Sequence, residues 1–165
     1  MPTIRPMQAA DAEAVLAIQR AAYPPPFHES WAVLGAKLAL YPAGCWVAEA
    51  AGRPCAYLFS HPGLSTRPAT LHGALAALPA APDCHYLHDL ALHPAHQGAG
   101  LGSRLRAQAV AQARSAGFHQ LALVAVQGSR PFWERQGFVP LELPQPEGLQ
   151  SYGADALAMV CALRG

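Results

Sequence analysis

The stretch His93–Arg106, HPAHQGAGLGSRLR, places three glycines at alternate positions just before a segment typical of a helix. These glycines are Gly98, Gly100 and Gly102. A helix N-terminus has backbone N–H groups without intrahelical acceptors and the positive end of the helix dipole, and glycine lets a ligand approach closely. The stretch therefore predicts a loop that binds an anion, and the identity of that anion decides the fold.

Two kinds of anion-binding loop fit this sequence poorly. A mononucleotide P-loop needs Lys and Ser or Thr after its last glycine, whereas Ser103 and Arg104 follow Gly102. A dinucleotide-binding loop could use Gly98, Gly100 and Ser103, but it belongs in a first βαβ unit and needs an acidic residue about 20 positions later. Here several predicted strands precede the loop, and the strand after it has no carboxylate. A glycine pattern alone also occurs where a helix simply begins, so the surrounding sequence must decide.

The chain as a whole has the size and composition of a single domain, residues 1–165. With 52% hydrophobic and 13% charged positions it can bury a sizeable core. A net charge of +1 gives no electrostatic basis for binding nucleic acid or an anionic membrane. No apolar run approaches the roughly 20 residues of a membrane span, and acidic residues stand where a signal peptide would be apolar. We expect a cytoplasmic protein whose partners are small molecules.

The four cysteines are scattered along the chain and form no C-x-x-C pair. They are Cys45, Cys55, Cys84 and Cys161. This spacing indicates neither a zinc site nor a disulfide framework. We therefore expect reduced thiols and no bound metal.

Hydrophobic periodicity and turn residues predict seven strands and four helices. The predicted strands cover residues 3–7, 45–50, 54–62, 85–92, 120–126, 139–143 and 154–163. The predicted helices cover residues 10–23, 31–40, 100–116 and 128–138, the second with Ser30 as its N-cap. This order indicates an α/β protein with a mixed sheet and helices on both of its faces. Residues 63–83 are long for a plain connection, and form either a surface loop with a short helix at Leu71–Leu78 or an insertion that faces the substrate.

Two segments resemble the signature motifs of the Gcn5-related N-acetyltransferase (GNAT) superfamily. In LHDLALHPAHQGAGLGSRL, residues 87–105, a strand ends in Leu-Ala-Leu-His-Pro, and the motif Q/R-x-x-G-x-G/A follows at Gln97, Gly100 and Gly102. The segment PFWERQGF, Pro131–Phe138, is similar to the second motif. The resemblance implies the GNAT fold, in which two central parallel strands splay apart. It also implies acetyl-coenzyme A as co-substrate, with its pyrophosphate on the glycine loop and its pantetheine arm paired to strand backbone.

Within that superfamily, the motifs are most similar to those of the arylalkylamine (serotonin) N-acetyltransferases. The resemblance rests on Tyr86–His93 and on Pro131–Trp133. It implies that His88 helps to move the substrate proton to water, while Tyr86 replaces another family histidine. Trp133 replaces the family tyrosine that protonates the leaving thiolate, and an indole N–H cannot transfer a proton at neutral pH. The acid must then lie elsewhere, with Tyr86 as the first candidate and Tyr152 as the second.

Elementary chemistry supports the same role for His88. Attack on a thioester needs a neutral amine, and histidine is the side chain suited to taking a proton near neutral pH. A backbone N–H near Leu92 could stabilise the oxyanion. Strand alternation places Tyr86, His88 and Leu90 on one face and His85, Leu87 and Asp89 on the other, which argues against a metal site in this segment. His88 could instead be a core histidine bonded to a carbonyl, and Asp89 could simply pair with a neighbouring side chain or loop N–H groups.

The candidate site residues fall into three groups. The catalytic candidates are His88 and Tyr86. Those expected to bind the co-substrate are Leu90, Ala91, Leu92, Gln97, Gly98, Ala99, Gly100, Leu101, Gly102, Ser103, Phe132 and Trp133. Those expected to contact the acceptor, in the segment between the first two helices, are Phe27, His28 and Glu29.

The sequence thus favours an N-acetyltransferase that moves acetyl from acetyl-coenzyme A to the primary amine of a small molecule by direct attack. One alternative is acetylation of a protein N-terminus or lysine. Another is a sensor that binds acyl-coenzyme A and has lost turnover, which the tryptophan at position 133 suggests. Homodimers are common in the superfamily, but no residue in the sequence identifies an interface.

Overall fold

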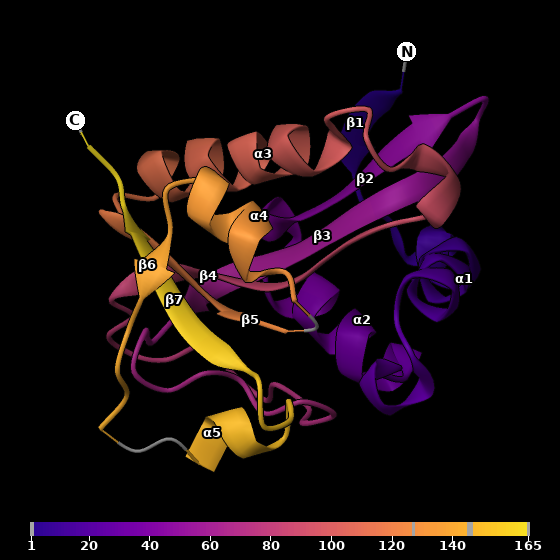
Figure 1. Ribbon diagram of the computed structural model, residues 1–165. Helices are drawn as coiled ribbons and strands as arrows, with labels where there is room; N and C mark the ends of the chain where they lie inside the picture. Colours follow the sequence, from indigo (N-terminus) through magenta and orange to yellow (C-terminus); the bar gives the residue numbers. More distant parts are fainter. Residues whose placement is uncertain (1, 127, 145–146, 165) are drawn as a thin grey trace.

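A seven-stranded mixed sheet, in the order β1-β2-β3-β4-β5-β7-β6, runs through the molecule (Figure 1). The computed structural model describes residues 2–126, 128–144 and 147–164. The strands are Thr3–Pro6 (β1), Cys45–Ala50 (β2), Arg53–Gly63 (β3), Cys84–Leu92 (β4), Gln120–Ala125 (β5), Val139–Pro140 (β6) and Leu157–Ala162 (β7). Neighbouring strands are antiparallel except β4 and β5, which are parallel. The predicted α/β mixed sheet of seven strands is confirmed.

Helices cover both faces of this sheet (Figure 1). They are Ala12–Ala22 (α1), Trp31–Leu40 (α2), Leu101–Ser115 (α3), Arg130–Arg135 (α4) and a single turn, Glu147–Gln150 (α5). The apolar sides of α1 and α2 form one core cluster with β2 and β3. Those of α3 and α4 form the other cluster, on the opposite face. The four predicted helices are present, and the Ser30 hydroxyl accepts the Val33 N–H at 3.3 Å as the expected N-cap of α2.

The C-terminal part differs from the prediction in detail. The strand expected over residues 139–143 is only Val139–Pro140, an edge strand in which Pro140 cannot donate a ladder hydrogen bond. The strand expected over residues 154–163 is Leu157–Ala162, and the turn α5 was not predicted. Within the described ranges, no helix is both long and apolar enough to cross a membrane.

The helix considered at Leu71–Leu78 does not form. His72 has a positive φ of 67°, which an α-helix does not allow. The Leu71 N–H donates to the Ser151 hydroxyl, and the His72 N–H donates to the Glu29 carboxylate, which ties the segment to distant parts of the chain. Leu71 also lines the main cleft described below, so the segment reaches that cleft, and whether it faces the substrate stays a prediction.

Strands β4 and β5 separate after three paired positions. The described pairs join residues 85–87 of β4 to residues 121–123 of β5, and both strands then continue without pairing to each other. This leaves one side of β4 open beyond Leu87, as the resemblance to the GNAT fold implied. A gap in the middle of a sheet exposes backbone N–H and C=O groups that can pair with a ligand.

A β-bulge interrupts β4 at this same point. Phe59 of β3 pairs with Asp89, and the next residue, Ser60, pairs with Leu87, so His88 has no partner in the register. An extra residue of this kind shifts the alternation of all side chains that follow.

The bulge corrects one prediction about side-chain faces. His88 and Asp89 both point toward the α1 and α2 face, where they bond to residues of that side. Leu87 and Leu90 both pack on the α3 face. The prediction that Leu90 shares a face with His88, and Asp89 with Leu87, is wrong because it assumed an uninterrupted strand.

Candidate active site

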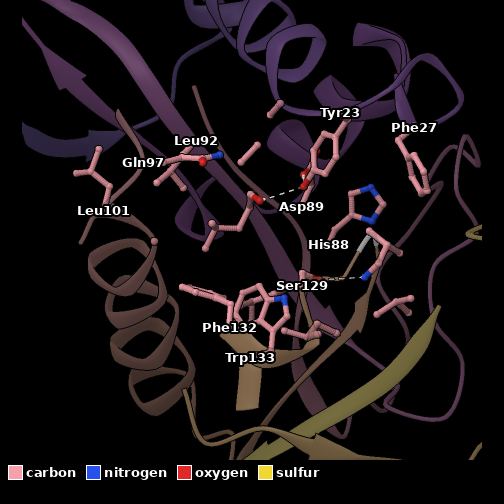
Figure 2. A pocket seen from close by; sticks show the side chains of 18 of the residues that line it. Tyr23, Phe27, His88, Asp89, Leu92, Gln97, Leu101, Ser129, Phe132 and Trp133 are labelled. Carbon is pink, nitrogen blue, oxygen red and sulfur yellow. Dashed lines mark hydrogen bonds between the residues drawn. The ribbon is translucent and has the colours of Figure 1, made fainter. Parts of the chain in front are cut away.

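A cleft of about 700 Å³ opens where β4 and β5 separate. Figure 2 shows Tyr23, Asp89 and His88 along one side of the cleft and Phe132 and Trp133 on another. The structure brings most of the predicted site residues to its walls. They are Phe27, Glu29, His88, Leu90, Ala91, Leu92, Gln97, Gly98, Gly100, Leu101, Gly102, Ser103, Phe132 and Trp133.

The glycine loop forms one end of this cleft. Gly98 and Gly100 have φ angles of +83° and +79°, and a side chain built on either would meet open space. The first backbone bond of α3 runs from the Arg104 N–H to the Gly100 carbonyl at 3.1 Å, so the N–H groups of residues 101–103 come before the helical ladder. Glycine is needed here for backbone conformation, and the loop offers an anion both free donors and a helix dipole.

Gly102, the third glycine, is needed for a different reason. A Cβ on Gly102 would lie 3.0 Å from the Phe132 ring, so glycine lets α3 pack closely against α4. Gln97 lies exposed at the loop, and in the described part of the chain its side chain makes no hydrogen bond. A bracing role for Gln97 therefore stays a prediction.

Aromatic rings of α4 build another wall of the cleft, next to Gly102. The Phe132 and Trp133 ring centroids are 4.9 Å apart, and Trp133 also packs at 5.3 Å from Phe138 in an edge-on arrangement. Trp133 is almost fully buried. Its position at the cleft makes it a rigid apolar surface, which agrees with the expectation that it does not supply a proton.

Glu29 and His88 form a buried pair at the other end of the cleft. The His88 Nε2 donates to Glu29 Oε1 at 2.6 Å, and the two side chains are only 1% and 2% exposed. Gln19 exchanges two hydrogen bonds with the Glu29 backbone, and the His72 N–H holds the second carboxylate oxygen. The pair links β4 to the segment before α2, 59 residues away in sequence.

The state of Glu29 fixes the state of its partner. Burial raises the pKa of Glu29, but hydrogen bonds from His88 and the His72 N–H outweigh burial and leave that pKa below its ordinary value. Glu29 is then an ionised acceptor, which requires the proton of neutral His88 on Nε2. The other ring nitrogen, Nδ1, is buried and has no partner among the described residues. A nitrogen with a free lone pair in a cleft can accept a proton from a substrate.

Asp89 is the centre of a second polar group next to this pair. Its Oδ2 accepts the Tyr57 hydroxyl at 2.7 Å, and its Oδ1 lies 3.0 Å from the Tyr23 hydroxyl. The Tyr23 hydroxyl is also 3.0 Å from the Leu90 carbonyl. Burial raises the pKa of Asp89 to about 6. The sequence left two kinds of partner open for Asp89, a neighbouring side chain or loop N–H groups. The contacts in the structure are with side chains.

Three predicted residues lie outside the walls of the cleft. Tyr86 shares a face with His88 as predicted, but it lines a smaller pocket beside His61, and its interactions are with Tyr152 and the Ala69 carbonyl. The His28 ring is held at 2.6 Å from the Tyr23 carbonyl, and Ala99 is exposed. Of the two tyrosines considered as the acid, Tyr152 is the one that lines the cleft.

Sequence reasoning missed Tyr23 and Lys37. Tyr23 ends α1 and meets Asp89 across 66 residues of sequence, so no local spacing could connect the two. Lys37 is fully buried in α2, and its Nζ has no partner among the described residues. Burial lowers the pKa of Lys37, while Glu29 and Asp89 oppose that effect. The one sequence feature that could have pointed to Lys37 is its place within an otherwise apolar helix.

No group of three His, Cys, Asp or Glu side chains in the described ranges is placed to hold a metal ion. His85, which the sequence placed near His88, is turned to the opposite face and bonds to the Ser60 hydroxyl at 2.8 Å.

Comparisons with known proteins agree with this architecture. No curated protein sequence matches the chain significantly. Among solved structures, the GNAT-like decarboxylase GphF, in complex with isobutyryl-CoA, has a TM-score of 0.78 and 21% identity over 98% of this chain and 100% of that chain. The loading GNATL domain of CurA from Lyngbya majuscula has a TM-score of 0.80 and 13% identity over 98% of each chain. The ribosomal-protein-S18-alanine N-acetyltransferase from Escherichia coli has a TM-score of 0.70 and 18% identity over 100% of this chain and 96% of that chain.

Structural similarity at these identities concerns the fold alone. The sequence itself matches the model of the Acetyltransferase (GNAT) family over residues 12–138, which include the segment before α2, the glycine loop and the PFWERQGF motif. With the divided sheet, the glycine loop before α3 and this match in place, the chain belongs to the GNAT family of acyltransferases.

Proposed function

We propose that this protein transfers an acetyl group from acetyl-coenzyme A to the primary amine of a small molecule, by direct attack of the amine on the thioester. The observation that carries the proposal is that the Glu29–His88 pair and the glycine loop lie at two ends of one cleft. A base at one end and an anion site at the other are what a transfer between two bound substrates needs.

Acetyl-coenzyme A fits the free surfaces of the cleft. Its pyrophosphate would meet the N–H groups of residues 98–103, and its pantetheine amides would pair with the open side of β4 at Leu90–Leu92. Phe132 and Trp133 would wall the thioester end. Among the described residues that line the cleft, Arg135 is the one arginine, and it is exposed.

The reaction would proceed without a covalent enzyme intermediate. His88 Nδ1 takes a proton from the ammonium group, and Glu29 stabilises the charged imidazole and keeps the ring in place. The amine nitrogen then forms a bond to the thioester carbon, and a backbone N–H near Leu92 stabilises the oxyanion. The nitrogen loses its second proton to solvent, the C–S bond breaks, and the departing sulfur takes up a proton to give the thiol. The buried Cys84, outside the cleft walls, takes no part.

The charge of the cleft favours a cationic acceptor. Glu29 is ionised because its pKa is lowered, and a buried carboxylate attracts an ammonium group and repels a carboxylate. This argues against the decarboxylation named for GphF, since an acyl group that carries a carboxylate would face Glu29. Phe27 and Leu71 provide apolar contacts for the body of an acceptor.

The test is consumption of acetyl-coenzyme A with a panel of aromatic amines, polyamines, aminoglycosides and peptides. We expect turnover with one class of small amine. Turnover with peptides alone would replace the proposal by protein N-acetylation, the activity named for the S18-alanine enzyme. Tight binding of coenzyme A with no turnover of any acceptor would support the sensor.

A further inference from the structure

The Tyr23 hydroxyl lies at the meeting point of two oxygen atoms in the cleft wall. It is 3.0 Å from Asp89 Oδ1 and 3.0 Å from the Leu90 carbonyl oxygen. Figure 2 shows the tyrosine ring reaching from α1 to Asp89, on the side of the cleft that holds His88. Leu90 is the residue at which the open side of β4 begins to receive the pantetheine arm in the proposed function.

A count of protons decides how these contacts are made. Tyr23 has a single hydroxyl hydrogen, and a carbonyl can only accept, so Tyr23 donates to Leu90 when that bond is formed. The short contact to Asp89 Oδ1 is then a hydrogen bond only if Asp89 is protonated and donates to the Tyr23 oxygen. Tyr57 donates to the other carboxyl oxygen at 2.7 Å, which is compatible with a neutral Asp89. Burial, which raises the pKa of Asp89 to about 6, keeps this neutral form accessible near neutral pH.

The reaction needs a proton on the other side of the thioester. Departure of the coenzyme A thiolate is faster when an acid donates a proton to sulfur, and Trp133, at the family position for the acid, has no proton to transfer at neutral pH. Tyr86 does not line the cleft. The hydroxyls of Tyr152 and Tyr23 each contact a backbone carbonyl, that of Ala69 and that of Leu90, but the Tyr23 hydroxyl also contacts the Asp89 carboxyl. Among the tyrosines of the cleft, Tyr23 has a hydroxyl backed by a second group that holds a proton.

We propose that Tyr23 is the general acid that protonates the departing thiolate and that Asp89 returns a proton to Tyr23; this rests on the proposed acetyl transfer. When the C–S bond breaks, its electron pair goes to sulfur. Sulfur takes the hydroxyl proton of Tyr23, and the Tyr23 oxygen takes the proton of Asp89. The ammonium nitrogen gives up two protons in the whole reaction, one to His88 before attack and one after the new C–N bond has formed. One of them restores Asp89 through solvent and the other is released, so the thiol gains one proton.

The β-bulge accounts for the closeness of the two proton-handling groups. In a regular strand, His88 and Asp89 would point to opposite faces. The bulge turns both toward the same side of the sheet, where Tyr23 and Glu29 meet them.

The test compares two acetyl donors that differ in the leaving group, with hydroxylamine as nucleophile. Hydroxylamine is uncharged at neutral pH and needs neither His88 nor an acceptor site. Acetyl-coenzyme A releases a basic alkyl thiolate whose departure an acid assists, whereas S-phenyl thioacetate releases a much less basic aryl thiolate that leaves without such help. We expect Tyr23→Phe to lose roughly 10²-fold in cleavage of acetyl-coenzyme A, the usual scale for loss of a general acid, and little in cleavage of S-phenyl thioacetate.

Tyr57→Phe is the matched control, because it removes the other hydroxyl bonded to Asp89 but belongs to a residue outside the cleft walls. Any effect of this variant should be equal for the two donors. Coenzyme A binding by Tyr23→Phe, measured by calorimetry, should be retained. Equal losses with both donors, or no loss with acetyl-coenzyme A, would overturn the role of Tyr23. Because hydroxylamine replaces the amine, failure of every acceptor in the panel would count against the proposed acceptor and not against this acid.

Discussion

At the scale of single residues, His88 is the strongest test of the proposed chemistry. His88→Gln keeps a polar side chain that can still bond to Glu29, but it removes Nδ1, the proposed proton acceptor. We expect coenzyme binding to persist and turnover to fall by roughly 10²-fold or more. The acidic limb of the pH–rate profile should also flatten. His85→Gln is the control, since this second histidine of β4 points to the opposite face; full turnover by His88→Gln would make His88 a structural residue.

The thiols supply a second prediction at this scale. Cys84 is the cysteine within β4, but it is fully buried and outside the cleft walls, and burial raises the pKa of its thiol well above the ordinary range. A protonated thiol is a poor nucleophile. Cys84→Ala should therefore retain at least half of the activity in a steady-state assay. Mass spectrometry that finds an acetyl group on Cys84 during turnover would contradict direct transfer.

Of the two residues in the Glu29–His88 pair, the sequence alone could suggest a catalytic role only for His88. The motif around the glycine loop points to His88, whereas Glu29 appeared only as a weak acceptor contact. Its position depends on the Gln19 side chain, which holds the Glu29 backbone, and on the His72 N–H, which bonds to the carboxylate. Contacts between positions so distant in sequence cannot be predicted from the local spacing of residues.

At the scale of elements, the two ends of α3 offer a matched comparison. Gly100 before α3 and Gly117 after it have φ angles of +79° and +84°, and a side chain at either would meet open space. Valine at either position therefore costs similar backbone strain, of the order of 1–3 kcal/mol. Only Gly100→Val also places a side chain where the pyrophosphate would lie. Calorimetry should show that Gly100→Val loses coenzyme A affinity while Gly117→Val keeps it; equal affinities would remove the glycine loop from the site.

Most elements could be predicted from periodicity and turn residues, but the bulge in β4 could not. The segment HYLHDLAL reads as a continuous strand, and its extra residue becomes visible only against the register of β3. The segment at Leu71–Leu78 has an ambiguous composition, and its conformation depends on bonds to Ser151 and Glu29. In both places a partner element from elsewhere in the chain decides the local structure.

At the scale of the whole molecule, ionisable groups are buried where α1, α2 and the sheet meet. Asp89 is the most informative of them, because it lies within this layer and its pKa is raised. The groups that face it come from α2, β3, β4 and the segments directly after α1 and before α2. They are Tyr23, which follows α1, Lys37 of α2, Tyr57 of β3, His88 of β4 and Glu29. Charge in this layer links the stability of the fold to pH.

The sign of that link follows from the direction of the shift. Burial raises the pKa of Asp89 from 3.8 to about 6, so the folded state holds this proton more tightly than the unfolded state. Its contribution to stability is complete below pH 4 and is lost as the pH rises toward 6, by at most about 3 kcal/mol. Asp89→Asn keeps a polar group for Tyr23 and Tyr57 and removes the titration. The unfolding free energy of the wild-type protein minus that of the variant, from urea titrations at a series of pH values, should therefore fall between pH 4 and 6 and then level off. Glu29, whose shift has the opposite sign, is present in both proteins and largely cancels, so a difference that stays constant or rises would show that the buried Asp89 carboxyl is already ionised at low pH.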